Sequence, residues 1–193
     1  IAALLAMRVA DLHRQERAPR RPGLVREGIR YVRRRPDLVV IITVVGVVAA
    51  LGLNFQLTSA MMAATEFGRG ATEYGLLGSV TAIGSLTGAL AAARRTRPRL
   101  RLVVGAAGAF GVSAGLMALA PTYELYVLSC IPVGLTALTM ITSANAAVQT
   151  TTTPRMRGRV MALYMMIFMG GTPIGSPAVG WIGEHVGPRW AIG

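Results

Sequence analysis

Amide and hydroxyl side chains inside long uncharged stretches are the residues of this chain best suited to bind a small molecule. They recur at positions i, i+3 and i+7 between Leu125 and Pro154, and at i and i+4 between Leu38 and Thr65. Either spacing places the side chains on one face of a helix. Hydrogen bonding between neighbouring helices is the alternative role for such groups. As cavity residues we predict Asn54 and Thr58 in the first stretch, and Thr142, Asn145 and Gln149 in the second.

Catalytic and metal-binding chemistry lacks its usual residues. Cys130 is the single cysteine, and His13 and His185 are far apart in the sequence. The sequence contains no Walker loop, no HExxH motif and no nucleophile elbow. No Asp, Glu, His, Lys or Arg lies inside any of the long uncharged stretches. We therefore expect no enzymatic activity, no cofactor and no metal ion.

Five uncharged stretches dominate the hydropathy pattern. The chain is 53% hydrophobic with mean hydropathy +0.53, which is more apolar than a typical soluble domain. Each stretch can cross a bilayer as a helix of roughly 20 residues. A soluble protein of this size could not surround five helices that are apolar on all sides. We predict an all-α, polytopic transmembrane helix bundle with spans at about 38–60, 74–93, 102–121, 125–150 and 159–183, and the start of another at 188–193.

All twenty basic residues are arginine, and the net charge is +12. Ten arginines precede the first stretch, five lie between the second and third, and three lie between the fourth and fifth, whereas the alternate connections hold one, none and one. This alternation predicts a protein of the cell membrane with its arginine-rich loops in the cytoplasm. The segregation argues against a nucleic-acid partner and is explained by topology and anionic lipids. The loop charges of interest are Arg94, Arg95, Arg157 and Arg159.

Glycine pairs spaced four residues apart occur in three of the stretches. Small residues at this spacing let two helices approach closely in lipid. Prolines are tolerated inside a membrane helix because neighbouring helices and hydroxyl groups satisfy the freed carbonyls. The segment GGTPIGSP is therefore predicted to belong to a bendable, closely packed span. The predicted packing residues are Gly84, Gly88, Gly111, Gly115, Gly171, Pro173, Gly175 and Pro177.

The segment before the first stretch is predicted to be a cytoplasmic connection. Residues 1–7 resemble the end of an earlier span, and residues 8–36 are rich in arginine and proline. Within them Val25, Ile29 and Val32 predict a short amphipathic helix on the inner membrane surface. Residues 37–193 then form the bundle. From these ends we expect a fragment of a longer protein.

Two segments carry a resemblance to a known family. They are the basic loop GALAAARRTRPRLR and the stretch RGRVMALYMMIFMGGTPIGSPAVGWIGEHVGPR. Together with the short corners they resemble the C-terminal half of a major facilitator superfamily transporter. The segment REGIRYVRRRP resembles the linker that precedes the seventh helix in the enterobactin-exporter and macrolide-efflux-like branch. The resemblance implies a parent of twelve helices, of which this chain supplies the seventh to the eleventh.

Two family motifs map onto the sequence with changes. The basic loop matches the G-x-x-x-D-R-x-G-R-[KR] signature from Gly88 onward, but Ala92 stands where the family has Asp. The stretch GGTPIGSPAVGW resembles the glycine–proline antiporter motif of drug exporters, here in the eleventh helix rather than the fifth.

The resemblance implies a secondary transporter that exports a drug-like or siderophore-like small molecule, with a proton as coupling ion. Its partners would be the lipid bilayer, the substrate and an N-terminal six-helix half of the same chain. The coupling carboxylate would lie in that half, because the five stretches contain no Asp, Glu, His, Lys or Arg. The alternatives are a small-solute importer of the same fold, or a non-transporting scaffold or permease subunit.

Overall fold

The computed structural model describes residues 24–93 and 100–192, and these residues form a bundle of long helices. Five helical segments are long and apolar enough to cross a membrane: Pro36–Glu66, Ala71–Ala92, Leu100–Ala118, Tyr123–Thr151 and Pro154–His185. The elements in chain order are α2 (Leu24–Arg33), α3 (Pro36–Val47), η2 (Val48–Gly52), α4 (Phe55–Met61), η3 (Met62–Glu66), α5 (Ala71–Ala93), α6 (Leu100–Ala118), α7 (Tyr123–Thr151), α8 (Pro154–His185) and α9 (Pro188–Ile192).

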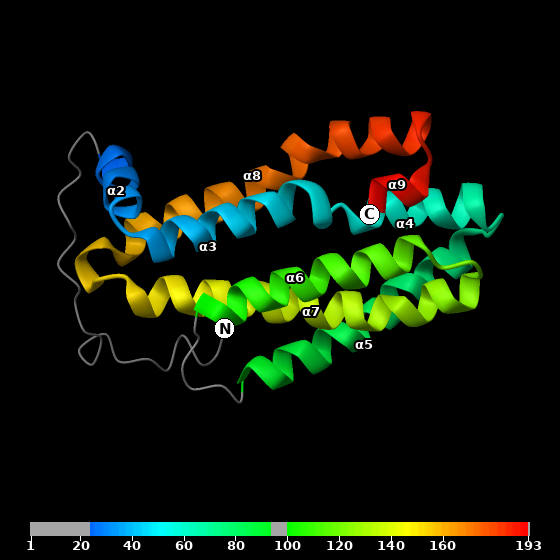
Figure 1. The fold of residues 1–193 in the computed structure, drawn as a ribbon, viewed down its shortest axis with the longest axis horizontal. Coiled ribbons are helices and arrows are strands. Elements are labelled where there is room, and N and C mark those ends of the chain that lie inside the picture. Colours follow the sequence, from blue (N-terminus) through cyan, green and yellow to red (C-terminus); the bar gives the residue numbers. More distant parts are fainter. Residues whose placement is uncertain (1–23, 94–99, 193) are drawn as a thin grey trace, which may run out of the picture.

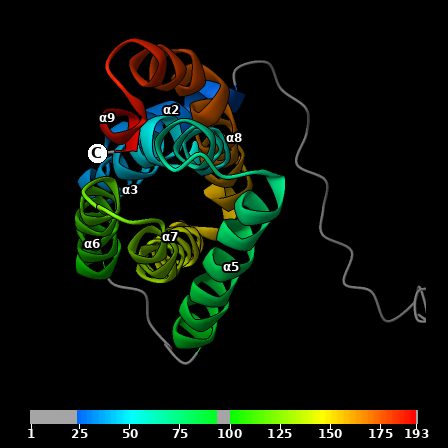
Figure 2. The ribbon, with the colours of Figure 1, turned by 90° about the vertical axis from the view of Figure 1, so that its right-hand side faces the viewer.

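The spans pack in two groups that lie side by side (Figures 1 and 2). In the first group α8 packs along the first span, from α3 through η2 to α4. In the second group α5 and α6 both pack against α7. One apolar core joins the groups near the start of α8, around Ile41, Met140 and Tyr164, and a second lies near the start of α7, around Phe110 and Tyr126. Many large apolar side chains stay exposed around the bundle, as expected of helices that face lipid.

The first span is an interrupted helix, whereas the sequence predicted one apolar span at about 38–60. Two π-helical segments, η2 and η3, flank the short helix α4, and the helix stops at Leu53 and Asn54. No proline lies between residues 37 and 66, so neither a helix breaker nor the hydropathy indicated the break. Irregular backbone at membrane depth is tolerated where it is buried in protein and its polar groups are bonded. The neighbouring helix α8 supplies both conditions, as the contacts below show.

The segment GGTPIGSP does not end its helix, because α8 runs from Pro154 to His185 with Pro173 and Pro177 inside it. The helix changes direction about halfway along its length (Figure 1). A proline removes one N–H from the ladder and pushes on the preceding turn, which accounts for a bend there. Both prolines are exposed, so their rings point away from the first span.

Four of the predicted packing glycines lie at close helix crossings. A Cβ at Gly175 would overlap the carbonyl of Ala50, and one at Gly171 would lie 2.7 Å from the Ala49 Cβ. On α5, a Cβ at Gly84 would overlap the Ile131 carbonyl oxygen of α7, and one at Gly88 would lie 2.6 Å from the Leu135 oxygen. Only glycine permits these two crossings.

Gly111 and Gly115 on α6 behave differently. Among the described residues, no atom lies within 4 Å of a Cβ built at either position. A packing role for these two glycines therefore stays a prediction.

The helix α2 occupies the position of the predicted amphipathic helix and packs on the start of α8. A Cβ at Gly28 would lie 3.5 Å from the Arg159 Cβ, and Glu27 forms an ion pair with Arg159 at 2.6 Å. Val32 is buried, whereas Val25 and Ile29 are exposed. The apolar stripe of α2 thus faces the bundle at one end only.

The opposite end of the bundle is held by Arg189 of α9. Its Nε donates to Glu66 Oε2 at 3.2 Å, and its Nη1 donates to the carbonyls of Ala118 and Ala120 at 3.1 and 2.8 Å. A cation at the last carbonyls of a helix offsets their partial negative charge. This side chain thereby ties together the ends of the first and third spans.

Candidate functional site

The predicted polar stripe of α7 lines an open hollow of about 330 Å³. Thr142 and Asn145 are half-buried, and Gln149 is exposed. All lining residues come from α7, so the described residues form one wall of the hollow and leave the other side open. They are Ile141, Thr142, Asn145, Ala146, Gln149 and Thr150.

The two amides of the stripe bind each other. Gln149 Nε2 donates to Asn145 Oδ1 across one turn of the helix. This bond fixes both side chains and leaves the Asn145 amide nitrogen as a donor and the Gln149 carbonyl as an acceptor. Thr142 Oγ1 donates to the Leu138 carbonyl at 2.6 Å, so its hydroxyl oxygen is left to act as an acceptor. The stripe therefore offers neutral hydrogen-bonding groups on a largely apolar wall.

Asn54 lies at the break in the first span, apart from this hollow. Its side chain is only 5% exposed, and its Nδ2 donates to the Ala50 carbonyl at 2.7 Å. Its Oδ1 accepts a hydrogen bond of 2.6 Å from Ser176 Oγ of α8. Thr172 of α8 adds a hydroxyl bond of 3.2 Å to the Ala49 carbonyl. These bonds satisfy polar groups at the interrupted backbone and hold it against α8.

Thr58, the second candidate of the first span, is also buried. Its Oγ1 donates to the Asn54 carbonyl at 3.2 Å, which extends the same network by one turn. It lines a small hollow of about 20 Å³ between the first span and α6, together with Phe110 and Met117. Such a volume suits a single water rather than a substrate. The structure thus brings Asn54 and Thr58 together, but does not place them beside the stripe of α7.

The four predicted loop arginines differ in their surroundings. Arg159 is half-buried and ion-paired with Glu27, whereas Arg157 is exposed. Arg94 and Arg95 lie outside the described residues. Among the residues that are described, no group of three His, Cys, Asp or Glu side chains is arranged to hold a metal ion.

Three contacts were not predicted from the sequence. Ser176 and Thr172 bond to the break from α8, and Glu27 pairs with Arg159. The sequence does contain a pattern that indicates Thr172 and Ser176. They are four residues apart, and each directly follows a predicted packing glycine, Gly171 or Gly175. Hydroxyl groups beside close-approach glycines are placed to reach a neighbouring backbone. The pairing of Arg159 with Glu27 depends on how α2 packs on α8. A sequence pattern within either helix does not predict that packing.

Comparison with protein families gives a match over most of the chain. The Major Facilitator Superfamily matches residues 42–193, which include nearly all of the five candidate spans. Comparisons with curated proteins and with solved structures give no match. The all-helical fold with its five apolar spans agrees with part of the architecture of that family. No branch within the family is distinguished by this match. This chain, a multi-pass membrane protein and not an enzyme, therefore belongs to the Major Facilitator Superfamily of membrane transporters.

Proposed function

We propose that the chain forms the C-terminal half of a secondary transporter that exports a drug-like or siderophore-like small molecule by alternating access. The observation that carries the proposal is the stripe of Thr142, Asn145 and Gln149 on the open wall of α7. Polar residues that face a cavity inside a membrane bundle are the default substrate contacts. An N-terminal half of six helices would supply the wall opposite to α7.

The chemistry of the wall bears on the class of cargo. The stripe has amides and hydroxyls but no charged group, and its neighbours Ile141 and Ala146 are apolar. A charged or sugar-like solute is held in the membrane by ion pairs or by many hydrogen bonds, which this wall lacks. Bulky, mainly apolar molecules fit it better, and these are the usual cargo of exporters.

The proton is proposed as coupling ion, with its carboxylate outside this half. A coupling group must change its pKa between the two access states, which requires a titratable side chain in the membrane. The uncharged cores of the five spans contain no carboxyl, histidine, lysine or arginine side chain. Protons would enter the cell while the substrate leaves it. The arginine-rich loops would face the cytoplasm.

Alternating access requires helices that change shape, and we assign this role in the described half to the pair formed by the first span and α8. The break at Leu53 and Asn54 faces the bend of α8, and hydroxyl groups of α8 bond to the break. Discontinuous helices recur in transporters, where one repeat rocks against the other around the substrate site. We assign the rocking motion of this half to that pair.

The test is an efflux assay on cells that express the full protein and are loaded with ethidium, a planar aromatic dye. Export should stop when a protonophore collapses the proton gradient. The double variant Asn145→Ala with Gln149→Ala should raise KM for the dye, because it removes the paired amides. The control is Ser79→Ala on α5, whose exposed hydroxyl bonds to its own helix at the Gly75 carbonyl.

Faster dye uptake on expression would favour the importer of the same fold instead. Equal kinetics for the double variant and the control would remove the stripe from the substrate site.

A further inference from the structure

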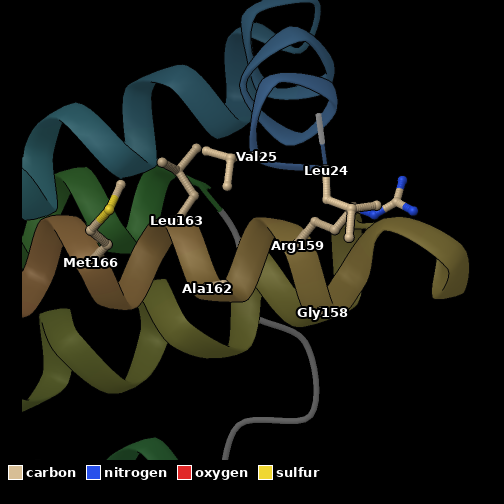
Figure 3. A pocket seen from close by; sticks show the side chains of 7 residues that line it. All are labelled: Leu24, Val25, Gly158, Arg159, Ala162, Leu163 and Met166. Carbon is tan, nitrogen blue, oxygen red and sulfur yellow. The ribbon is translucent and has the colours of Figure 1, made fainter. Parts of the chain in front are cut away.

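We propose that the groove between α2 and the start of α8 binds one anionic phospholipid. The groove has a volume of about 290 Å³ and is lined by Leu24 and Val25 of α2 and by Gly158, Arg159, Ala162, Leu163 and Met166 of α8 (Figure 3). Apart from Arg159, every one of these side chains is apolar. The stripe of α7 takes no part in the groove, so this site is distinct from the proposed substrate site.

The groove has a polar end and an apolar end. Arg159 lies at one end, Val25 and Leu163 point toward each other in the middle, and Met166 lies farther along α8 (Figure 3). Because α8 begins at Pro154, the apolar end lies deeper in the span than the arginine end. A phospholipid has the same order of groups, since its phosphate lies at the membrane surface and its acyl chains lie below. A water-soluble apolar ligand lacks a charged group and would not match the arginine at the polar end.

Both helices that form the groove carry further arginines. Arg155 lies on α8 one turn before Arg159, on the same face of the helix. On α2, Arg26 and Arg33 are exposed beside the apolar stripe that contains Val25. Within the described ranges, Arg159 makes its contacts to Glu27 and Met156 through Nη1, which leaves Nε and Nη2 for another acceptor. A phosphate group is the acceptor that such a cluster prefers.

The exposure of α2 identifies lipid as the occupant. Val25 is 66% exposed and Ile29 is 40% exposed, although the helix ends only three residues before the first span begins at Pro36. A short helix at this height lies in the headgroup region of the bilayer, where apolar side chains contact acyl chains. Exposed arginines there attract anionic lipids. The groove therefore opens toward lipid of the leaflet on the arginine-rich side.

The experiment is a lipid titration followed by native mass spectrometry of the full protein, purified in mild detergent and stripped of lipid. The probes are phosphatidylglycerol and phosphatidylcholine with the same acyl chains. The wild-type protein should retain one phosphatidylglycerol more tightly than phosphatidylcholine. Ala162→Trp should abolish this tight site because the indole fills the groove. The matched control is Ala178→Trp, which changes an exposed alanine in the other half of the same helix.

A second pair of variants tests the headgroup contacts without placing bulk in the groove. Arg26→Gln combined with Arg155→Gln should weaken retention of phosphatidylglycerol by about 25-fold, which is about five-fold for each arginine. Retention of phosphatidylcholine should not change. Arg157→Gln, an exposed arginine on another face of α8, should leave the preference intact.

Two results would overturn the proposal. One is equal retention of phosphatidylglycerol by Ala162→Trp and Ala178→Trp, which would mean that another protein segment fills the groove or that it stays empty. The other is an unchanged lipid preference in the double arginine variant, which can be measured even if the tryptophan variants fail to fold.

Discussion

The crossing of the first span and α8 depends on one atom-scale feature, the missing side chain of Gly175. A Cβ at this position would overlap the Ala50 carbonyl and lie 2.9 Å from the Ala50 Cα. The obstacle is backbone, so it cannot rotate away as a side chain would. The substitution Gly175→Ala must therefore push the two helices apart or distort the π-helical segment η2.

Three terms set the size of the effect. Forcing a methyl group into a packed contact costs about 1–3 kcal/mol. Separation of the helices also weakens the two hydroxyl bonds from Ser176 and Thr172, each worth about 0.6 kcal/mol on average in a membrane. Alanine is favoured over glycine by about 1 kcal/mol inside a helix, which offsets part of this cost. We expect Gly175→Ala to destabilise the protein by about 1–3 kcal/mol.

The same helix provides the control. Among the described residues nothing lies within 4 Å of a Cβ at Gly170, so Gly170→Ala isolates the gain in helix propensity. This variant should be as stable as the wild-type protein or slightly more so.

The assay is thermal unfolding of the purified full protein in detergent, followed by size-exclusion chromatography of the heated samples. Gly175→Ala should have a lower apparent Tm than Gly170→Ala. Equal Tm values for the two variants would refute the close crossing.

Further predictions concern the break and the two ends of the bundle. Asn54→Leu should destabilise the protein by about 1–3 kcal/mol because it leaves buried polar groups unpaired, whereas Ser176→Ala should cost less than half as much; denaturant titration compares them. Arg189→Gln should speed amide hydrogen exchange at the end of α6, and Glu66→Gln should do so less, because the arginine donates to the carbonyls of Ala118 and Ala120. The hydroxyl of Thr153 and then its backbone N–H donate to the phenolic oxygen of Tyr31 and lower the pKa of that group. Ultraviolet titration should therefore show one tyrosine, absent in Tyr31→Phe, that ionises below its ordinary pKa.

Part of the architecture could be predicted from the sequence because it depends on local composition. The uncharged stretches predicted five spans, and the described residues contain five helical segments that are long and apolar enough to cross a membrane. The spacing of Gly84 with Gly88, and of Gly171 with Gly175, predicted close crossings that the structure contains. Helix periodicity needs only the chain itself, so these features are readable before any tertiary contact is known.

The identity of each packing partner was decided by the tertiary structure. The pairs Gly111 with Gly115 and Gly171 with Gly175 have the same spacing, yet only the second meets a neighbouring backbone among the described residues. No proline or charged residue next to Asn54 predicts the break in the first span. It exists where α8 approaches closely enough to bond Asn54 and the Ala49 carbonyl through its own hydroxyls. The sequence by itself determined which segments enter the membrane, because that depends on the transfer of each segment from water to lipid. Only the tertiary structure decided where a helix stops within the membrane, since buried backbone groups there are stable only when a neighbouring helix bonds them.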